Sequence, residues 1–162
     1  MTSQVNTYER LFDNAVEGIF QTLPDGKYLR VNPSLARIYG YDSAEELMAD
    51  LTNIADQLYV DPDRRETFMR EIEKNDVIQD FESRIRNRDG SITWITESAR
   101  AVRDLCGTLM YYEGFVSNIT ERKEAEHRQA ALESDLHQAH MMTALGHLAG
   151  GVAHDFKTLL AL

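Results

Sequence analysis

Apolar and polar residues follow two different periods along this chain. Up to about residue 120 the apolar positions fall into short runs separated by turn residues. Beyond that point they recur every three or four residues. Alternation over a short run is typical of a strand, and a period of three to four is typical of a helix. The pattern predicts a mixed domain followed by one long amphipathic helix.

The first 120 residues predict two strands, then several short helices, then three strands. A Pro24-Asp25-Gly26 turn joins the first strand pair, and an Asp89-Gly90 turn joins a later one. Asp42 or Ser43 and Asp61 are the expected helix caps. The expected strands are Gly18–Leu23, Tyr28–Val31, Ile78–Arg86, Ile92–Val102 and Leu109–Ser117, and the expected helices are Tyr8–Val16, Pro33–Tyr39, Ser43–Leu47 and Asp63–Lys74.

The segment from Glu121 to Leu162 contains no proline and carries a single apolar stripe. At 1.5 Å per residue its helix would reach about 60 Å, which is longer than an isolated globular helix usually becomes. Pairing with a second copy would bury the stripe, so we expect a parallel homodimeric coiled coil. The stripe consists of Leu132, Leu136, Ala139, Met142, Leu145, Leu148, Val152, Phe156 and Leu159.

Composition narrows the class of protein. The chain has 162 residues, a formal net charge of −10 and a pI near 4.9, which argues against nucleic acid or anionic lipid as partners. Its single cysteine excludes an internal disulfide framework. No apolar run reaches 18 residues, so we expect a cytoplasmic segment. A membrane-anchored parent stays open, because a spanning segment could lie upstream.

Candidate chemistry lies in the helix. His154 is followed by Asp155 and, one turn later, by Thr158. His154 lies about 200° around the helix from Val152 and Phe156, so its imidazole should point away from the apolar stripe. A neutral imidazole beside a carboxylate is a competent nucleophile for phosphoryl transfer. On spacing alone, an ordinary exposed histidine is the more frequent explanation of such a pair.

Three of the five histidines of this helix recur at a fixed interval but do not suggest a metal site. His140, His147 and His154 recur every seven residues, which corresponds to about 10.5 Å along a helix. That spacing is too long for one metal ion to bind two of them. We therefore expect no metal.

The segment Thr143–Phe156, with Gly150-Gly151-Val152-Ala153 before His154, resembles the H-box of sensor histidine kinases. This box forms the first helix of their dimerisation and histidine-phosphotransfer domain. The resemblance implies that His154 accepts the γ-phosphoryl group of ATP and that Asp155 assists proton transfer. Thr158 would position water during dephosphorylation of the partner. Many members have Asn-Asn where this chain has Lys157-Thr158, so phosphatase competence stays open.

The same resemblance implies parts that these 162 residues do not supply. Phosphoryl transfer from ATP needs Mg²⁺ and a nucleotide-binding catalytic domain, and a phosphotransfer bundle needs a second helix. We therefore expect this fragment to hold the phosphoacceptor and to be inactive alone. Its implied partners are the kinase catalytic domain of the parent and a response-regulator receiver domain.

Four phrases in the first 120 residues resemble a PAS domain across about residues 7–120. They are Asn32–Tyr41, Asp61–Arg65, Arg88–Ser91 with Trp94, and Tyr112–Lys123. The resemblance implies an α+β fold, with a five-stranded antiparallel sheet and short flanking helices ahead of the long coiled-coil helix. Asn118 stands where the closing Asp-Ile-Thr triplet usually has aspartate, which keeps a hydrogen-bonding side chain.

PAS domains enclose a pocket between sheet and helices, which implies a candidate ligand site of unknown chemistry. Plain core would use the same residues. All five histidines lie after residue 126, which argues against haem, although Met69, Tyr59 and Cys106 stay open as iron ligands. Cys106 lies outside any light-sensing cysteine motif, which argues against a photoreactive flavin. The candidate lining is Phe20, Ile38, Leu58, Phe68, Ile72, Phe81 and Ile95.

These observations predict a PAS sensor domain over 1–120, a coiled-coil signalling linker over 121–140 and a truncated phosphotransfer helix over 141–162. The predicted function is the sensory and phosphoacceptor part of a two-component histidine kinase, in which the PAS domain controls phosphorylation of His154 through the paired helices. The alternative is a non-sensing PAS module for dimerisation or interaction within a larger signalling protein.

Overall fold

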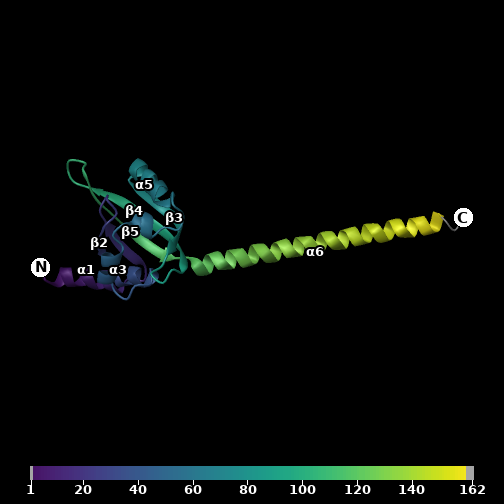
Figure 1. Ribbon diagram of the computed structural model, residues 1–162, viewed down its shortest axis with the longest axis horizontal. Coiled ribbons are helices and arrows are strands. Elements are labelled where there is room, and N and C mark those ends of the chain that lie inside the picture. Colours follow the sequence, from purple (N-terminus) through teal and green to yellow (C-terminus); the bar gives the residue numbers. More distant parts are fainter. Residues whose placement is uncertain (1, 160–162) are drawn as a thin grey trace. The chain divides into compact units, whose positions relative to one another are not determined.

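The computed structural model describes the backbone of residues 2–159 and the side chains of residues 7–146. The chain divides into two units, the first ending at Thr120 and the second beginning at Glu121. The first unit contains a five-stranded sheet with short helices, and the second is a single helix (Figure 1). Each unit is described separately below.

The sheet combines a hairpin with a three-stranded meander. The hairpin contains β1 (Gly18–Thr22) and β2 (Tyr28–Val31), and the meander contains β3 (Val77–Arg86), β4 (Ile92–Arg103) and β5 (Leu109–Asn118). Pairing of β1 with β5 joins them in the order β2-β1-β5-β4-β3, with every neighbour antiparallel. The expected α+β fold with a five-stranded antiparallel sheet is confirmed.

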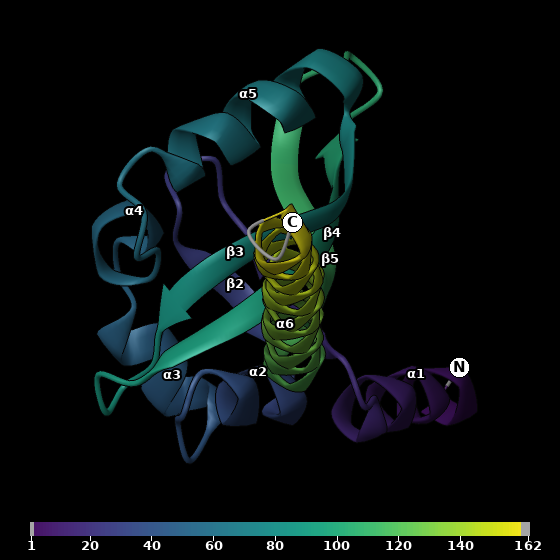
Figure 2. The same cartoon turned by 90° about the vertical axis from the view of Figure 1, so that its right-hand side faces the viewer.

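Four helices connect the hairpin to the meander. They are α2 (Pro33–Ile38), α3 (Ala44–Asp50), α4 (Ile54–Gln57) and α5 (Arg64–Asn75), and α1 (Thr2–Asn14) precedes the sheet. Helix α2 contacts β1 and β5, α3 contacts β2, and α5 contacts β3 and β4. These helices therefore cover one face of the sheet (Figure 2). The interior lies between them and that face.

Side chains of the strands alternate between the interior and the opposite face. In β4 the buried positions are every second residue from Thr93 to Ala99, and in β5 Tyr112 and Val116 share this period. The alternation in β3 shifts where a bulge separates Ile78 from Phe81. A two-residue period with one buried face is what an antiparallel sheet against a helical layer requires.

Asn32 joins three elements at the start of the domain. Its Oδ1 accepts hydrogen bonds from the backbone N–H of Ile19 at 2.8 Å and of Leu35 at 2.9 Å. Its Nδ2 donates to the carbonyls of Phe12 at 3.1 Å and Glu17 at 2.9 Å. The side chain is fully buried, so α1, β1 and α2 depend on one amide for their junction.

Three sequence expectations need correction. The first helix ends at Asn14 rather than Val16, because the chain turns there toward β1. Helix α4 was not expected, since four residues are too few to show a helical period. Asp61 was an expected cap, but Asp63 occupies that position without a side-chain bond, and Asp61 binds Arg84 at 2.6 Å instead.

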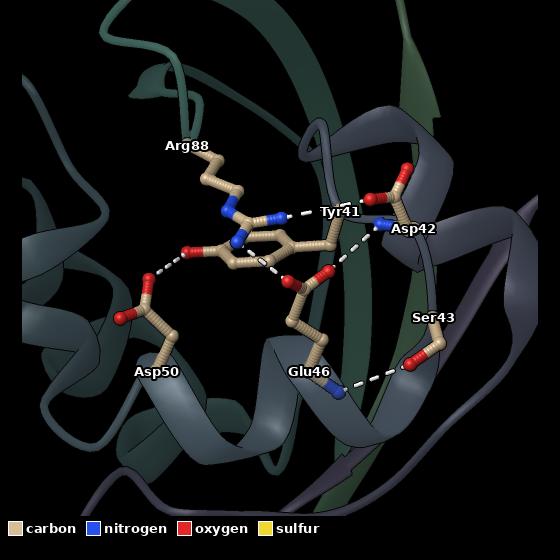
Figure 3. A network of polar contacts seen from close by, with 6 residues as sticks. All are labelled: Tyr41, Asp42, Ser43, Glu46, Asp50 and Arg88. Atoms are coloured by element: carbon tan, nitrogen blue, oxygen red, sulfur yellow. Dashed lines mark hydrogen bonds and ion pairs between the residues drawn. The ribbon is translucent and has the colours of Figure 1, made fainter.

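A polar network holds α3 against the turn between β3 and β4 (Figure 3). Ser43 caps α3, as expected, because its Oγ accepts from the N–H of Glu46 at 3.2 Å. The Glu46 carboxylate binds the Arg88 guanidinium at 2.5 Å and accepts from the N–H of Asp42 at 3.1 Å. The Tyr41 hydroxyl donates to Asp50 at 2.7 Å, and burial raises the pKa of that phenol. These contacts fasten the helical layer to the sheet.

The second unit is α6 (Thr120–Leu159), which confirms the long C-terminal helix. The Oδ1 of Asn118 accepts from the N–H of Thr120, the first residue of this helix, at 2.9 Å, so the side chain in place of the usual aspartate does make a hydrogen bond here. Leu132, Leu136 and Leu145 of the apolar stripe are exposed in the single chain. Among the described residues, no helix combines the length and apolarity needed to cross a membrane.

Candidate functional site

The seven residues expected to line a PAS pocket lie together in the first unit. Six of them are buried in its hydrophobic core, and Ile38 is partly buried against that core. Phe68 and Phe81 meet edge to face with ring centroids 5.5 Å apart. An apolar lining and an ordinary core share these features, so the polar groups of the interior decide what it can bind.

Glu97 places a carboxyl group in the middle of this interior. It lies on β4 in the inward-facing register, opposite Phe81 of β3 and Val116 of β5. Only 4% of its surface is exposed. A charged side chain is rarely buried to this degree unless neighbours stabilise it.

The surroundings of Glu97 shift its proton equilibrium. The Tyr59 hydroxyl, itself buried, donates to Glu97 Oε2 at 2.9 Å. Burial raises the pKa of Glu97 to about 7, while the Tyr59 hydrogen bond and the charges of Arg65 and Arg64 oppose that rise. Glu97 therefore exchanges its proton close to neutral pH.

Three further groups border this carboxyl. Burial raises the pKa of the Tyr28 and Tyr39 phenols well above their ordinary value, and Glu97 adds to both shifts. The positive charge of Arg65 acts on Tyr28, Tyr59 and Glu97. Within the described part of the chain, the Tyr39 hydroxyl and Arg65 Nη2 are buried without a hydrogen-bond partner. The Tyr28 and Tyr39 phenols also act on each other's pKa.

We name this group the interior polar cluster, defined by Tyr28, Tyr39, Tyr59, Arg65 and Glu97. It can bind or release a proton at Glu97, and two of its buried polar atoms, the Tyr39 hydroxyl and Arg65 Nη2, are left without a direct partner among the described residues. No set of three or more histidine, cysteine or acidic side chains suited to a metal occurs in the described residues.

Sequence reasoning missed the interior polar cluster: of its members it named only Tyr59, and that one as a haem-iron ligand left open. The sequence did contain one indication of Glu97. It lies two residues from both Ile95 and Ala99 in an alternating strand, so it occupies a position that faces the interior. The other members come from β2, from the residue after α2, from α5 and from the segment after α4, and only the fold brings them together.

A separate hollow of about 580 Å³ lies on the other face of the sheet, beside α1. Of the expected pocket residues, only Phe20 reaches it. Phe115 and Val77 are exposed there, and Arg100 binds Glu113 at 2.5 Å near them.

Cys106 is exposed in the turn between β4 and β5.

The candidate phosphoacceptor residues His154, Asp155 and Thr158 belong to α6, but their side chains lie outside the described residues. The roles in phosphoryl transfer that the sequence predicts for them therefore stay predictions.

Comparison with known proteins finds a matching family and several similar proteins. The PAS fold family matches residues 28–116. Sensor histidine kinase TmoS of Ectopseudomonas mendocina is 21% identical over 99% of this chain and 16% of its own length. The C4-dicarboxylate transport sensor protein DctS of Rhodobacter capsulatus is 30% identical over 84% of this chain and 21% of its own length.

A crystal structure of a PAS domain from a two-component sensor histidine kinase superposes with a TM-score of 0.59 at 25% identity, covering 72% of this chain and 97% of that domain. The chain thus spans about a fifth or less of the two curated relatives but nearly the whole solved domain. These matches confirm the resemblance to sensor histidine kinases. Because the family match extends over more than half of its residues, the chain belongs to the PAS fold family.

Proposed function

We propose that this chain is the sensory and phosphoacceptor part of a two-component histidine kinase. One observation carries the proposal: the similarity to a sensor histidine kinase extends over 99% of this chain and so includes the segment around His154. His154 accepts the phosphoryl group, Asp155 assists proton transfer, and Thr158 positions water if the parent also dephosphorylates its partner. The residues 121–140 act as linker and 141–162 as phosphotransfer helix.

Control by the PAS domain requires a dimer in this proposal. The exposed leucines of α6 support pairing, because burying each large apolar side chain stabilises the assembly by about 1.5–3 kcal/mol. In a parallel pair, the PAS domains bias the rotation or register of the two helices and thereby the access of His154 to ATP.

The parent supplies the remaining chemistry. Its catalytic domain binds ATP and Mg²⁺, and a response-regulator receiver domain takes the phosphoryl group from His154. We place this segment in the cytoplasm, where ATP and receiver domains are available. A membrane anchor elsewhere in the parent protein is compatible with this placement.

The test is phosphoryl transfer to this chain in trans. The chain is incubated with ATP, Mg²⁺ and a separate histidine-kinase catalytic domain, and phosphohistidine is mapped by mass spectrometry. We expect phosphate on His154, none in His154→Gln, and unchanged labelling in the matched control His147→Gln. Labelling of the chain with ATP and Mg²⁺ alone, or labelling that survives His154→Gln, would contradict the proposal.

One observation favours the alternative of a non-sensing interaction module. Tyr8, Leu11, Val77 and Phe115 expose apolar surface around the hollow beside α1, as a protein-binding face does. A protein purified without any bound ligand, and unchanged in labelling by substitutions in the interior polar cluster, would support this second function.

A further inference from the structure

Glu97 is the one acidic side chain that the described part of the chain buries in its core. Its neighbours across the sheet, Phe81 of β3 and Val116 of β5, are both apolar. Among the described residues, its carboxyl accepts one hydrogen bond, from the Tyr59 hydroxyl, and makes no ion pair. A buried carboxylate with a single neutral donor is poorly stabilised as an anion, so these surroundings favour the neutral acid.

A cation lies near Glu97 without binding it. Arg65 of α5 acts on the carboxyl electrostatically, but no hydrogen bond or ion pair joins the two among the described residues. Its Nη2 is buried without a partner there, and its Cζ lies 5.2 Å from the centroid of the Phe68 ring. Arg64, the other cation that acts on Glu97, already binds Ser83 Oγ of β3 at 3.2 Å. Arg65 therefore has hydrogen-bonding capacity left for an anion at position 97.

We propose that Glu97 is a proton-operated switch of the PAS unit, in which ionisation of its carboxyl recruits Arg65 into an ion pair and changes how α5 packs on the sheet. The signal is the proton itself, so the switch needs no other ligand. When the O–H bond of the carboxyl breaks, the proton passes to water and the negative charge stays on Glu97. Because a buried anion without a cation is costly, the guanidinium leaves its weaker contact with Phe68. This inference deepens the sensory role proposed above, and its link to His154 rests on that role.

The switch operates near neutral pH. Burial raises the pKa of Glu97 to about 7, so the neutral acid dominates below that pH and the anion above it. Burial also raises the pKa of each surrounding phenol, and arginine stays charged, so Glu97 is the group whose charge changes between about pH 6 and pH 8. The titratable and charged groups around it are Tyr28 of β2, Tyr39 after α2, Tyr59 after α4, Arg64 and Arg65 of α5, and Tyr112 of β5.

The position of Glu97 connects this switch to the end of the PAS unit. Its partner on β5, Val116, lies shortly before Asn118, which ends that strand. The Oδ1 of Asn118 accepts from the N–H of Thr120, where α6 begins. On β4, Trp94 lies one turn of the pleat before Glu97, and its backbone N–H donates to Thr120 Oγ1 at 3.0 Å. A shift of β4 or β5 at Glu97 therefore has a short route to the first residue of α6.

The first measurement follows the native full chain from about pH 5 to pH 9. Infrared difference spectra report the Glu97 carboxyl, and fluorescence reports Trp94. We expect a transition near pH 7 in both signals, and neither transition in Glu97→Gln, which keeps a neutral hydrogen-bonding side chain. Arg65→Gln should raise the midpoint by about half a pH unit or more, because it removes a charge that favours the anion. The matched control Arg70→Gln, on the exposed face of α5, should leave the midpoint unchanged.

The second measurement tests whether ionisation moves α5. Hydrogen exchange of the α5 amides, corrected for the intrinsic effect of pH, should differ at least about threefold between pH 6 and pH 8 in the wild type. That difference should disappear in Glu97→Gln and shrink in Arg65→Gln. Tyr59→Phe removes only the hydroxyl that favours the anion, so it should fold normally and raise the midpoint of the carboxyl transition.

The third measurement tests the output. The rate of His154 phosphorylation in trans is taken at pH 6.5 and at pH 8 and divided by the rate for Glu97→Gln, which cancels the pH dependence of the catalytic domain. We expect this ratio to change at least about threefold between the two pH values. A constant ratio would overturn the link between the switch and His154.

The switch and the proposed kinase role fail in different ways. A Glu97 carboxyl that titrates near its ordinary pKa, or that titrates near pH 7 without changing exchange in α5, overturns the switch, and labelling of His154 is unaffected. Absence of label on His154 at every pH contradicts the kinase role, whereas the first two measurements still decide whether the switch exists.

Discussion

Glu97→Gln should change how the stability of the PAS unit depends on pH. The Glu97 carboxyl has a pKa of about 7 in the folded chain, against an ordinary value of 4.5. A carboxyl whose pKa rises on folding stabilises the protein while it is protonated. That contribution is complete below about pH 4.5 and is lost as the pH rises toward 7.

The size of the effect follows from the two pKa values. Their difference corresponds to about 3 kcal/mol of unfolding free energy, which the wild type loses almost entirely as the pH rises from about 4 to about 8. Because Glu97 is only 4% exposed, solvent screening should reduce this free-energy difference only slightly. Glutamine is neutral at every pH, so the variant should match the wild type near pH 4 and exceed its stability by up to about 3 kcal/mol at pH 8.

Urea unfolding followed by the fluorescence of Trp94 measures this difference at each pH. Other acidic groups contribute equally to both proteins, since the lowered pKa of Asp61 makes both lose stability as the pH falls through its folded pKa. Glu71→Gln, which removes an exposed carboxyl from α5, is the matched control. Parallel pH profiles for Glu97→Gln and the wild type would refute a buried, neutral-pH carboxyl.

Three other outcomes follow from the structure. Asn32→Ala, which removes the four hydrogen bonds of a buried amide, should lower the unfolding free energy by about 3 kcal/mol or more, and an unchanged urea midpoint would disprove its joining role. Sedimentation at tens of micromolar should show a dimer that Leu136→Glu dissociates and the control Gln138→Glu does not; a wild-type monomer would contradict pairing through α6. The purified protein should show no haem Soret band, and it should show no flavin absorption that bleaches in blue light. A Soret band, or flavin bleaching that disappears in Cys106→Ala, would overturn the cofactor prediction.

The strands and the long helix could be predicted from sequence because their signals are local. Alternation in β4 and the Asp89-Gly90 turn before it define a strand without reference to the rest of the chain. Helix α4 shows the limit, since its four residues leave no period to detect. Asp61 failed as a cap because Arg84, a residue on β3, competes for its carboxylate.

The interior polar cluster could be predicted only in part. Glu97 stands out as a charged residue at an inward position of a strand, which is visible in the sequence. Its pairing with Tyr59 joins residues 38 positions apart, and the approach of Arg65 depends on how α5 packs over the sheet. Such non-local contacts leave no pattern in a single sequence, whereas the apolar lining does.

In the function proposed here, the PAS unit controls His154 through the rotation or register of α6. Inserting two alanines after Gln129 would turn the following helix by about 200° without altering the residues on either side, and inserting seven would nearly restore its phase. The rate of His154 phosphorylation in trans is then compared among the three chains. We predict that the two-residue insertion changes the rate severalfold and that the seven-residue insertion returns it toward the wild-type value; equal rates in all three chains would contradict the claim.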